Sequence, residues 1–287
     1  MKTHLECIPC FIKQSLEAAR MATDDEAIHE EIIKDVMKYL QSISFSNSPP
    51  EISREVHNII RNKSNSSDPY KKVKDQSNKM AENLYPRLKE LIEESDDSLL
   101  MAIKLSIVGN VIDFGTSNRF NVEEILDKAI NQDFNDDAYP QFKESLIHAK
   151  TILYLADNTG EIFFDKPLIE ELVKRNKKIT YVVKANPIIN DATIDDAKFT
   201  GIDKLAKILE GDKGQNKSTP GILLKYASNE FLELFNSVDM VISKGQGNYE
   251  SLNESSRKIF FLLMVKCPLV ARDMGTELAR LVLEVKE

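Results

Sequence analysis

Acidic, amide and hydroxyl side chains gather in one short stretch, residues 157–161, directly after the apolar and β-branched run Thr151–Ala156. Such a run is typical of a buried strand, and the amphipathic pattern of Ile162–Arg175 predicts a helix beyond it. In open α/β sheets, ligands bind at such junctions, outside the carboxyl ends of the strands. Gly160 allows the backbone to approach a ligand closely, and the helix start offers unpaired N–H groups to an anion. We therefore expect a ligand site at this junction.

Two more predicted strands end in polar clusters. Residues 185–193 follow one of these strands, and residues 244–250 follow the other. Asx residues and glycines are common in any loop, so each cluster alone is a weak signal. The carboxyl ends of parallel strands meet at the same edge of a sheet, and we therefore expect the three clusters to face one crevice.

The oxygen-rich donors of these clusters indicate a hard cation. Asp157 and Asp191 supply carboxylates, and Asn158 supplies an amide oxygen. Oxygen ligands without His or Cys suit Mg²⁺ or Mn²⁺, and three protein ligands leave positions open for water and a substrate oxygen. Such a cation could polarise a phosphoryl group and lower the pKa of a bound water. Lys244 could then place positive charge beside the phosphoryl group, and the backbone at Gly245 could cradle it.

Other roles stay open for some of these side chains. Asp157 could cap the helix that follows it, or it could act as a covalent aspartyl nucleophile. Covalent phosphatases of that kind usually carry a second Asp two residues on, where this sequence has Thr159. Either Glu161 or Glu250 could orient the attacking water, and the sequence does not decide between them.

The composition limits the classes of function. The chain has 287 residues and a formal net charge of −8, which argues against broad nucleic-acid binding because that needs a basic surface. No apolar run reaches the roughly 18 residues of a membrane span, and the N-terminus lacks the apolar core of a signal peptide. A phosphorylated small-molecule substrate is not excluded, because a few local Lys residues suffice to bind it, and we expect a cytoplasmic protein that acts neither on nucleic acid nor at a membrane. The sequence gives no indication of the oligomeric state.

Cys7 and Cys10 form a CxxC pair at the start of a predicted helix. The pair could supply two ligands of a zinc or iron–sulfur site, for which His4 and Cys267 are the available partners. It could also be a redox pair, although thioredoxin-type motifs follow a strand and none precedes this one. The third interpretation is a pair of half-buried thiols without chemistry. Three cysteines are too few for a disulfide scaffold, which indicates a reducing compartment.

The first half of the chain has an almost purely helical pattern, and we expect a mainly α-helical subdomain over residues 1–148. Its apolar residues recur with a period of about 3.6. The predicted helix Ser98–Val111 is apolar nearly all round, which places it at the centre of that subdomain. Asn110 and Asp113 lie at its end, where they could cap the turn or reach the site from the helical side. The other helices are predicted over Asp24–Leu40, Ile52–Ile60, Tyr70–Glu94, Val122–Ile130 and Gln141–His148.

Strand-like and helix-like runs alternate after residue 148. This alternation predicts an α/β domain over residues 149–287, in which helices cover both faces of a mostly parallel sheet, as in a Rossmann-like three-layer core. The candidate metal site lies in this domain. The predicted strands are Thr151–Ala156, Ile179–Lys184, Ala206–Glu210, Val238–Ser243 and Lys258–Val265. The predicted helices are Phe164–Arg175, Ala227–Phe235, Tyr249–Glu254 and Thr276–Val285.

The order of five motifs along the chain resembles that of the metal-dependent damage-control phosphatases, a family long known only as a domain of unknown function. The motifs are CIPC at residues 7–10, GNVIDFG at 109–115, ADNTGE at 156–161, PIINDAT at 187–193 and KGQGNYE at 244–250. The N-terminal CxxC resembles the prokaryotic-type branch of this family. The resemblance implies a helical N-terminal part on an α/β core, and phosphomonoester hydrolysis with Mn²⁺, Mg²⁺, Co²⁺ or Ni²⁺.

The resemblance also implies roles for individual residues. The family's Asp–Asn–Asp set corresponds to Asp157, Asn158 and Asp191, which are expected to be both metal ligands and catalytic residues. Lys244 matches the family's phosphate position. The spacing before Asp191 varies among branches, so Asn190 could take part of its role. Substrates in this family are often sugar phosphates or damaged phosphometabolites and nucleotides that the enzyme clears. The expected substrate-binding residues are Lys244, Glu161, Asn110, Asp113, Asn190 and Gly245.

Two hypotheses from other classes stay open. A non-catalytic nucleotide- or metabolite-binding module would bind its ligand without turnover and would not need Asp191. A thiol–metal redox protein would depend on Cys7 and Cys10 rather than on Asp157.

Overall fold

The computed structural model describes residues 1–110, 126–132, 134–214 and 217–287, so that Asp113 lies outside the described residues. The strands are β1 (Phe134–Asn135), β2 (Thr151–Leu155), β3 (Lys178–Val183), β4 (Lys207–Glu210), β5 (Met240–Lys244), β6 (Ile259–Met264) and β7 (Leu281–Lys286). They form a seven-stranded sheet in the order β1-β7-β6-β5-β2-β3-β4. Neighbouring strands are parallel except β6 and β7, which are antiparallel. The mostly parallel sheet expected from the sequence is therefore confirmed.

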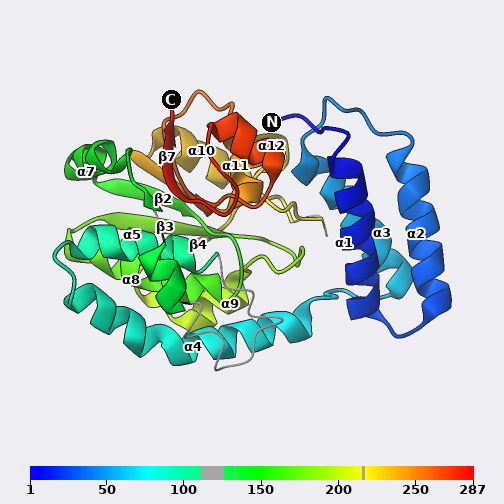
Figure 1. The fold of residues 1–287 in the computed structure, drawn as a ribbon, viewed down its shortest axis with the longest axis horizontal. Helices are drawn as coiled ribbons and strands as arrows, with labels where there is room; N and C mark the ends of the chain where they lie inside the picture. Colours follow the sequence, from blue (N-terminus) through cyan, green and yellow to red (C-terminus); the bar gives the residue numbers. More distant parts are fainter. Residues whose placement is uncertain (111–125, 133, 215–216) are drawn as a thin grey trace.

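Helices cover both faces of this sheet. They are α4 (Lys71–Glu93), α5 (Ser98–Val108), α7 (Tyr139–His148), α8 (Glu161–Lys174), α9 (Ile194–Thr200), α10 (Asn229–Ser237), α11 (Gln246–Leu252) and α12 (Pro268–Met274), with short 3₁₀ turns at Ile202–Lys204 and Leu224–Tyr226. Successive strand residues point to opposite faces, so Ile152 and Tyr154 belong to one hydrophobic core, whereas Leu153 and Leu155 belong to the other. Helices α4, α5, α8 and α9 cover the first face, and α10, α11 and α12 cover the second (Figure 1). The result is the expected three-layer core.

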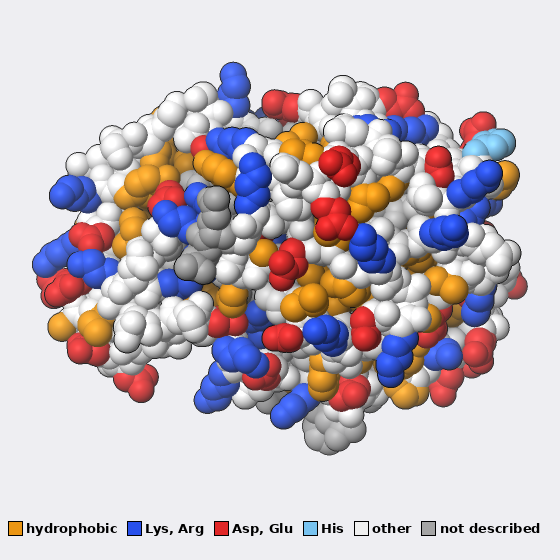
Figure 2. All heavy atoms as spheres, turned by 180° about the vertical axis from the view of Figure 1, so that it is seen from behind, with side chains coloured by type: hydrophobic (Ala, Val, Ile, Leu, Met, Phe, Trp, Pro, Cys, Tyr) orange, Lys and Arg blue, Asp and Glu red, His pale blue; other side chains and the backbone are white. Residues whose placement is uncertain are grey.

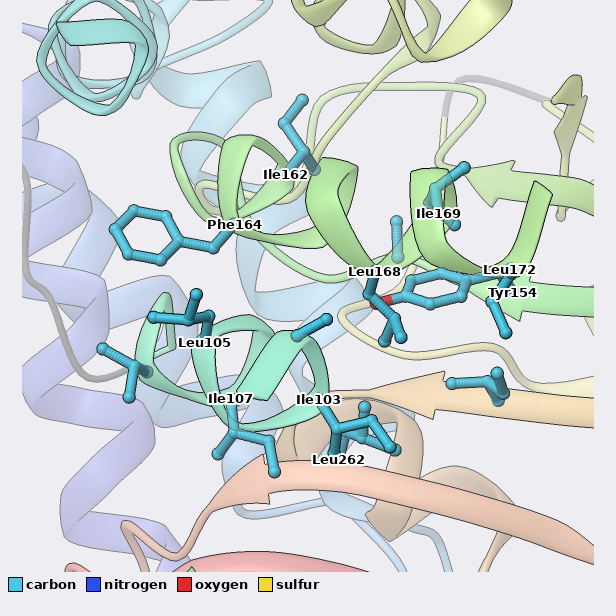
Figure 3. Packing of buried hydrophobic residues seen from close by; sticks show 14 of the residues in the cluster. Ile103, Leu105, Ile107, Tyr154, Ile162, Phe164, Leu168, Ile169, Leu172 and Leu262 are labelled. Atoms are coloured by element: carbon cyan, nitrogen blue, oxygen red, sulfur yellow. The ribbon is translucent and has the colours of Figure 1, made fainter. Parts of the chain in front are cut away.

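Helix α5 packs on the sheet and not at the centre of a separate helical unit. Leu105 lies on the side of α5 that faces α8, and Ile107 lies on the side that faces β6 (Figure 3). The helix is apolar nearly all round because it is enclosed between another helix and the sheet. One core therefore joins residues on both sides of position 148, and a domain boundary at that position stays a prediction.

The N-terminal helices α1 (Cys7–Ala22), α2 (Glu26–Leu40) and α3 (Pro49–Ser64) form a bundle beside the α/β core (Figure 1). Their apolar faces make a hydrophobic cluster of their own. Helix α3 also contacts the loops at the carboxyl edge of the sheet: Arg54 Nε donates to Lys217 O at 3.2 Å, and Arg61 Nη1 donates to Pro187 O at 2.8 Å. The bundle therefore borders the edge of the sheet where the sequence predicts the site.

The helix predicted over Thr276–Val285 is wrong, because residues 281–286 form strand β7. Leu278, Leu281, Val282 and Val285 have helical spacing, yet β7 pairs with β6 on one side and with β1 on the other. The sheet therefore overrides the local pattern. The other predicted strands are present, as are the predicted helices that fall within the described residues, with ends that differ by a few residues. Elements β1, α9 and α12 were not predicted.

The surface mixes charges of both signs. On the face shown in Figure 2, the Lys and Arg side chains are interspersed with Asp and Glu side chains and do not gather into areas of one sign. Among the described residues, no helix is long and apolar enough to cross a membrane.

Candidate active site

The site lies where the strand order reverses. From β2 the chain adds β3 and β4 on one side, and it then returns to add β5 and β6 on the other side. The switch point between β2 and β5 is where open α/β sheets bind ligands. Asp157 follows β2, Asp191 lies in the loop after β3 and Gly245 follows β5. A bridge pairs Asn158 with Asp191, and Ala192 N donates to Asp157 O at 2.8 Å, so the clusters meet as predicted.

Two amide groups hold the carboxylates of Asp157 and Glu161 side by side. Asn110 Nδ2 donates to Asp157 Oδ2 at 3.0 Å and to Glu161 Oε2 at 2.8 Å. Asn158 Nδ2 donates to the same two oxygens at 2.8 Å and 3.1 Å. Asn110 thus reaches the site from the helical side, as one of the two sequence interpretations expected.

Gly245 makes room for the Asp157 carboxylate. Its φ is +78°, and a Cβ atom at this position would lie 1.9 Å from Asp157 Oδ2 and 2.2 Å from Asp157 Cγ. No side chain fits at that distance. The sequence predicts that Gly245 cradles a phosphoryl group. In the structure, the absence of a side chain at Gly245 makes room for the carboxylate of Asp157, a candidate metal ligand.

Asp191 is paired with Lys184, a residue to which the sequence analysis gave no role. The two side chains are 4% and 2% exposed, and Lys184 Nζ lies 3.5 Å from Asp191 Oδ2. Within the described residues, neither atom has a hydrogen-bond partner. Asn190 meets the site through its backbone, since its carbonyl accepts from Thr159 N at 2.9 Å and from Thr159 Oγ1 at 3.1 Å.

Lys244 is completely buried. Its Nζ donates to Ser106 O at 2.8 Å, to Glu161 Oε1 at 2.6 Å and to Asp165 Oδ1 at 2.6 Å. An ammonium group has three N–H donors, so this arrangement leaves none for a phosphate. In this structure Lys244 holds the Glu161 carboxylate in place. This role differs from the contact with a substrate phosphate that the sequence predicts for Lys244.

Further residues of the site were missed by the sequence analysis. Asp165 accepts from Tyr154 OH at 2.7 Å and from Tyr181 OH at 2.9 Å. The i,i+4 spacing of Glu161 and Asp165 on one helix could have indicated that both face Lys244. Asn78 of α4 accepts a hydrogen bond from Gly160 N at 2.8 Å and fixes the turn before α8. A lone Asn in a polar helix gives no such signal.

Burial, together with neighbouring carboxylates, raises the pKa values of Asp157 and Asp191. Burial raises the pKa of Asp157 well above its usual range, and the charges of Glu161 and Asp191 raise it further. Burial raises the pKa of Asp191 to about 6, against the opposing effect of Lys184. Both shifts mean that the site favours a positive charge near these oxygens.

The donor set fits a hard divalent cation. Within the described ranges, no cluster of three or more His, Cys, Asp or Glu side chains could hold a metal, so the candidate set consists of two carboxylates and an amide. Asp191 Oδ2 and Asn110 Oδ1 are buried and lack hydrogen-bond partners among the described residues. Carboxylate and amide oxygens are ligands that Mg²⁺ and Mn²⁺ prefer. Asp157, Asn158 and Asp191 therefore suit such an ion.

Among the described residues, the CxxC pair is not part of a metal-binding cluster of three or more His, Cys, Asp or Glu side chains. Cys7, Cys10 and Cys267 are free thiols, and Cys10 is exposed. Burial raises the pKa of the Cys7 thiol, and Glu250, Cys267 and Cys10 raise it further, against a backbone hydrogen bond at His4. A raised pKa reduces the thiolate fraction that redox chemistry needs.

Two clefts border the loop that carries Asp191. One, of about 640 Å³, is lined by α4 and α9 residues, with Pro187 and Thr193 from the loop. The other, of about 730 Å³, includes Arg61, Asn186 and Lys217. Ser66, Ser67 and Pro187 line both clefts. They offer polar space for a small molecule next to the carboxyl edge of the sheet.

The fold is that of an α/β protein with a cluster of acidic and amide side chains at the switch point of a mostly parallel sheet. Residues 3–282 match the model of the damage-control phosphatase ARMT1-like domain. The chain belongs to this family.

Relatives and a solved structure match over nearly the whole chain. The damage-control phosphatase of Archaeoglobus fulgidus is 34% identical over all of both chains. That of Pyrococcus horikoshii is 35% identical over 96% of this chain and 94% of its own. A Methanocaldococcus jannaschii protein described as uncharacterized is 37% identical over 96% of this chain and 93% of its own. The crystal structure of a DUF89 family protein from Pyrococcus horikoshii superposes with a TM-score of 0.92, at 34% identity over 100% of both chains.

Proposed function

We propose that this chain is a divalent-metal-dependent phosphatase that hydrolyses small phosphomonoesters, such as sugar phosphates or damaged phosphometabolites and nucleotides, in a damage-control role. The observation that carries this proposal is a pair of carboxylates, the half-buried Asp157 and the buried Asp191, brought together at the switch point by the bridge between Asn158 and Asp191. The names of two relatives, both damage-control phosphatases, support the reaction class.

Asp157, Asn158 and Asp191 would hold the cation, with Mn²⁺, Mg²⁺, Co²⁺ and Ni²⁺ as candidates. When bound, a divalent cation supplies Lewis acidity and positive charge to phosphoryl oxygens. Glu161 keeps the amide groups of Asn110 and Asn158 turned toward Asp157, because it accepts hydrogen bonds from both.

The shielded carboxylates serve catalysis through pre-organisation. Hydrogen bonds from Asn110 and Asn158 fix the Asp157 carboxylate, and the bridge to Asn158 fixes the backbone of Asp191, so little reorganisation is needed when charge develops on the phosphoryl group. Lys244 forms ion pairs with both Glu161 and Asp165, and it thereby fixes Glu161, which in turn holds the amide groups beside Asp157.

The test measures hydrolysis of p-nitrophenyl phosphate and of a panel of phosphorylated metabolites after chelation, and again with each candidate ion restored. Asp157→Asn and Asp191→Asn are compared with the wild-type chain. Asp239→Asn is the matched control, because Asp239 accepts hydrogen bonds from Lys150 N and Thr151 N at the amino end of β2. Thermal unfolding with and without each ion gives an independent measure of binding, since an ion that binds only the folded state raises Tm.

We expect turnover to require an ion, and to fall at least a hundredfold in both site variants but not in the control. The ion-dependent rise in Tm should vanish in the same two variants. Turnover that survives chelation, or that persists in Asp157→Asn, would refute the site. Ion binding without turnover on any ester would favour a non-catalytic binding module.

A further inference from the structure

Lys184 has a buried ammonium group that makes no hydrogen bond to the residues that the structure describes. Its side chain is 2% exposed, and in the described part of the chain its Nζ has no hydrogen-bond partner. Its ion-pair partner, Asp191 Oδ2, is 3.5 Å away. Burying an ammonium group without hydrogen bonds is costly, so such a group calls for a partner that the protein alone does not supply.

Other buried lysines of the described chain are better satisfied. Lys244 Nζ donates three hydrogen bonds, all at 2.8 Å or less. Lys74 Nζ donates to Asp68 Oδ2 at 3.3 Å and lies 3.7 Å from Asp196 Oδ2. Lys184 thus differs from both because, among the described residues, its ammonium group makes no hydrogen bond at all.

The backbone fixes Lys184 beside both candidate carboxylate ligands. Lys184 N donates to Ala192 O at 2.9 Å, and Ala192 N donates to Asp157 O at 2.8 Å. Ala192 directly follows Asp191 in the chain. The side chain of Lys184 therefore starts from a position held by the two segments that carry the carboxylates.

A cation at Asp157 and Asp191 would satisfy Asp191 Oδ2 but not Lys184 Nζ, because an ammonium group only donates hydrogen bonds. The missing partner must accept hydrogen bonds, and it must tolerate a position next to a cation. An anion with several oxygens meets both conditions, and a phosphoryl group can bind the cation through one oxygen and an ammonium group through another.

We propose that Lys184 donates to the phosphoryl oxygens of the phosphomonoester bound at Asp157 and Asp191. The inference rests on the proposed function in one respect, that a phosphate group occupies this site. The proposal gives a substrate-binding role to Lys184, which the sequence analysis described only as the last residue of a predicted strand.

The test measures the affinity of the metal-loaded protein for inorganic phosphate by isothermal titration calorimetry, for the wild-type chain and for Lys184→Gln. Glutamine can still hydrogen bond to Asp191 but carries no charge. Lys217→Gln is the matched control, because Lys217 lines the neighbouring cleft and pairs with Glu55 at 3.1 Å. If Lys184→Gln does not fold, Lys184→Met, which keeps most of the side-chain volume, takes its place.

We expect Lys184→Gln to bind phosphate roughly ten- to a hundredfold more weakly, which is the usual effect of losing one charge-assisted hydrogen bond. The control should keep the wild-type affinity. A folded Lys184→Gln with unchanged phosphate affinity would overturn the inference and leave Lys184 as a structural partner of Asp191. Loss of affinity in Lys217→Gln alone would overturn it too, because phosphate would then bind in the cleft.

Failure of the proposed function would have a different signature. The wild-type chain would bind phosphate and lose that binding in Lys184→Gln, yet it would hydrolyse no phosphomonoester. Conversely, metal-dependent hydrolysis together with unchanged phosphate affinity in Lys184→Gln would refute the role of Lys184 and leave the phosphatase intact.

Discussion

Replacing Gly245 with alanine tests the packing of the site with a single methyl group. The backbone at Gly245 has φ +78° and ψ 164°, a conformation that is essentially restricted to glycine. The new Cβ would lie 1.9 Å from Asp157 Oδ2, far inside contact distance. Either the backbone or the Asp157 carboxylate must therefore move.

The expected cost has two parts. Forcing a residue with a Cβ into this backbone conformation costs about 1–3 kcal/mol. Overpacking against a fixed group costs about 1–3 kcal/mol more. The free energy of unfolding should thus fall by about 2–6 kcal/mol. The displaced carboxylate should also weaken ion binding, because Asp157 is a candidate ligand.

Gly275→Ala is the matched control for Gly245→Ala. Gly275 also has a positive φ, +65°, but no atom lies within 4 Å of a Cβ built there. Its substitution should cost only the left-handed backbone conformation, about 1–2 kcal/mol. Urea unfolding followed by circular dichroism measures both stabilities, and the ion-dependent change in Tm and the rate of ester hydrolysis measure the site.

The comparison of the two variants decides the outcome. We expect Gly275→Ala to keep ion binding and turnover, and Gly245→Ala to lose most of both. If Gly245→Ala were as stable as the control and bound the ion with wild-type affinity, the contact between Gly245 and Asp157 would not constrain the site.

Two further predictions concern buried charges. Lys244→Met should lower the free energy of unfolding by about 3–5 kcal/mol in urea titrations, because it leaves Glu161 and Asp165 buried without their ammonium partner. Unchanged stability with a loss of phosphate affinity would instead make Lys244 the phosphate contact. Burial raises the pKa of Glu250 to about 7. The folded state therefore binds the Glu250 proton more tightly than the unfolded state does, and this binding stabilises the fold at low pH. The stabilisation is lost as the pH rises from about 4.5 toward 7. In Tm measurements between pH 4.5 and 7, Glu250→Gln should remove this loss of stability. The control Glu254→Gln, at an exposed position, should keep it. Equal pH profiles for the wild-type chain and both variants would contradict the role of Glu250.

The carboxyl edge of the sheet could be predicted because its signals are local. An apolar run followed by polar residues marks a strand end whatever lies around it, and this holds for Asp157, Asp191 and Gly245. The parallel topology then brings the three ends together. The meeting of the clusters therefore follows from the order of the elements alone.

The environment of each lysine could not be predicted from the sequence. Lys184 and Lys244 both end β-branched or apolar strands, so they look alike in the sequence. Lys244 is satisfied by groups from α5 and α8, which are distant in the chain, whereas Lys184 is not satisfied within the described residues. Partners of this kind depend on tertiary packing, which periodicity does not encode.

Strand β7 lies inside the sheet, although it is made after the other strands. Its residues pair with β6 on one side, while β1 depends on the distant pairs Phe134–Leu281 and Asn135–Val282 on the other. Strands β2, β3 and β5 find their pairing partners in segments that precede β7, whereas β6 has an unpaired edge without β7. Long-range pairings form slowly, and open edges invite intermolecular pairing. The strands that carry the candidate site therefore precede β7 in the chain, and β7 must cover the open edge of β6 before the sheet is complete.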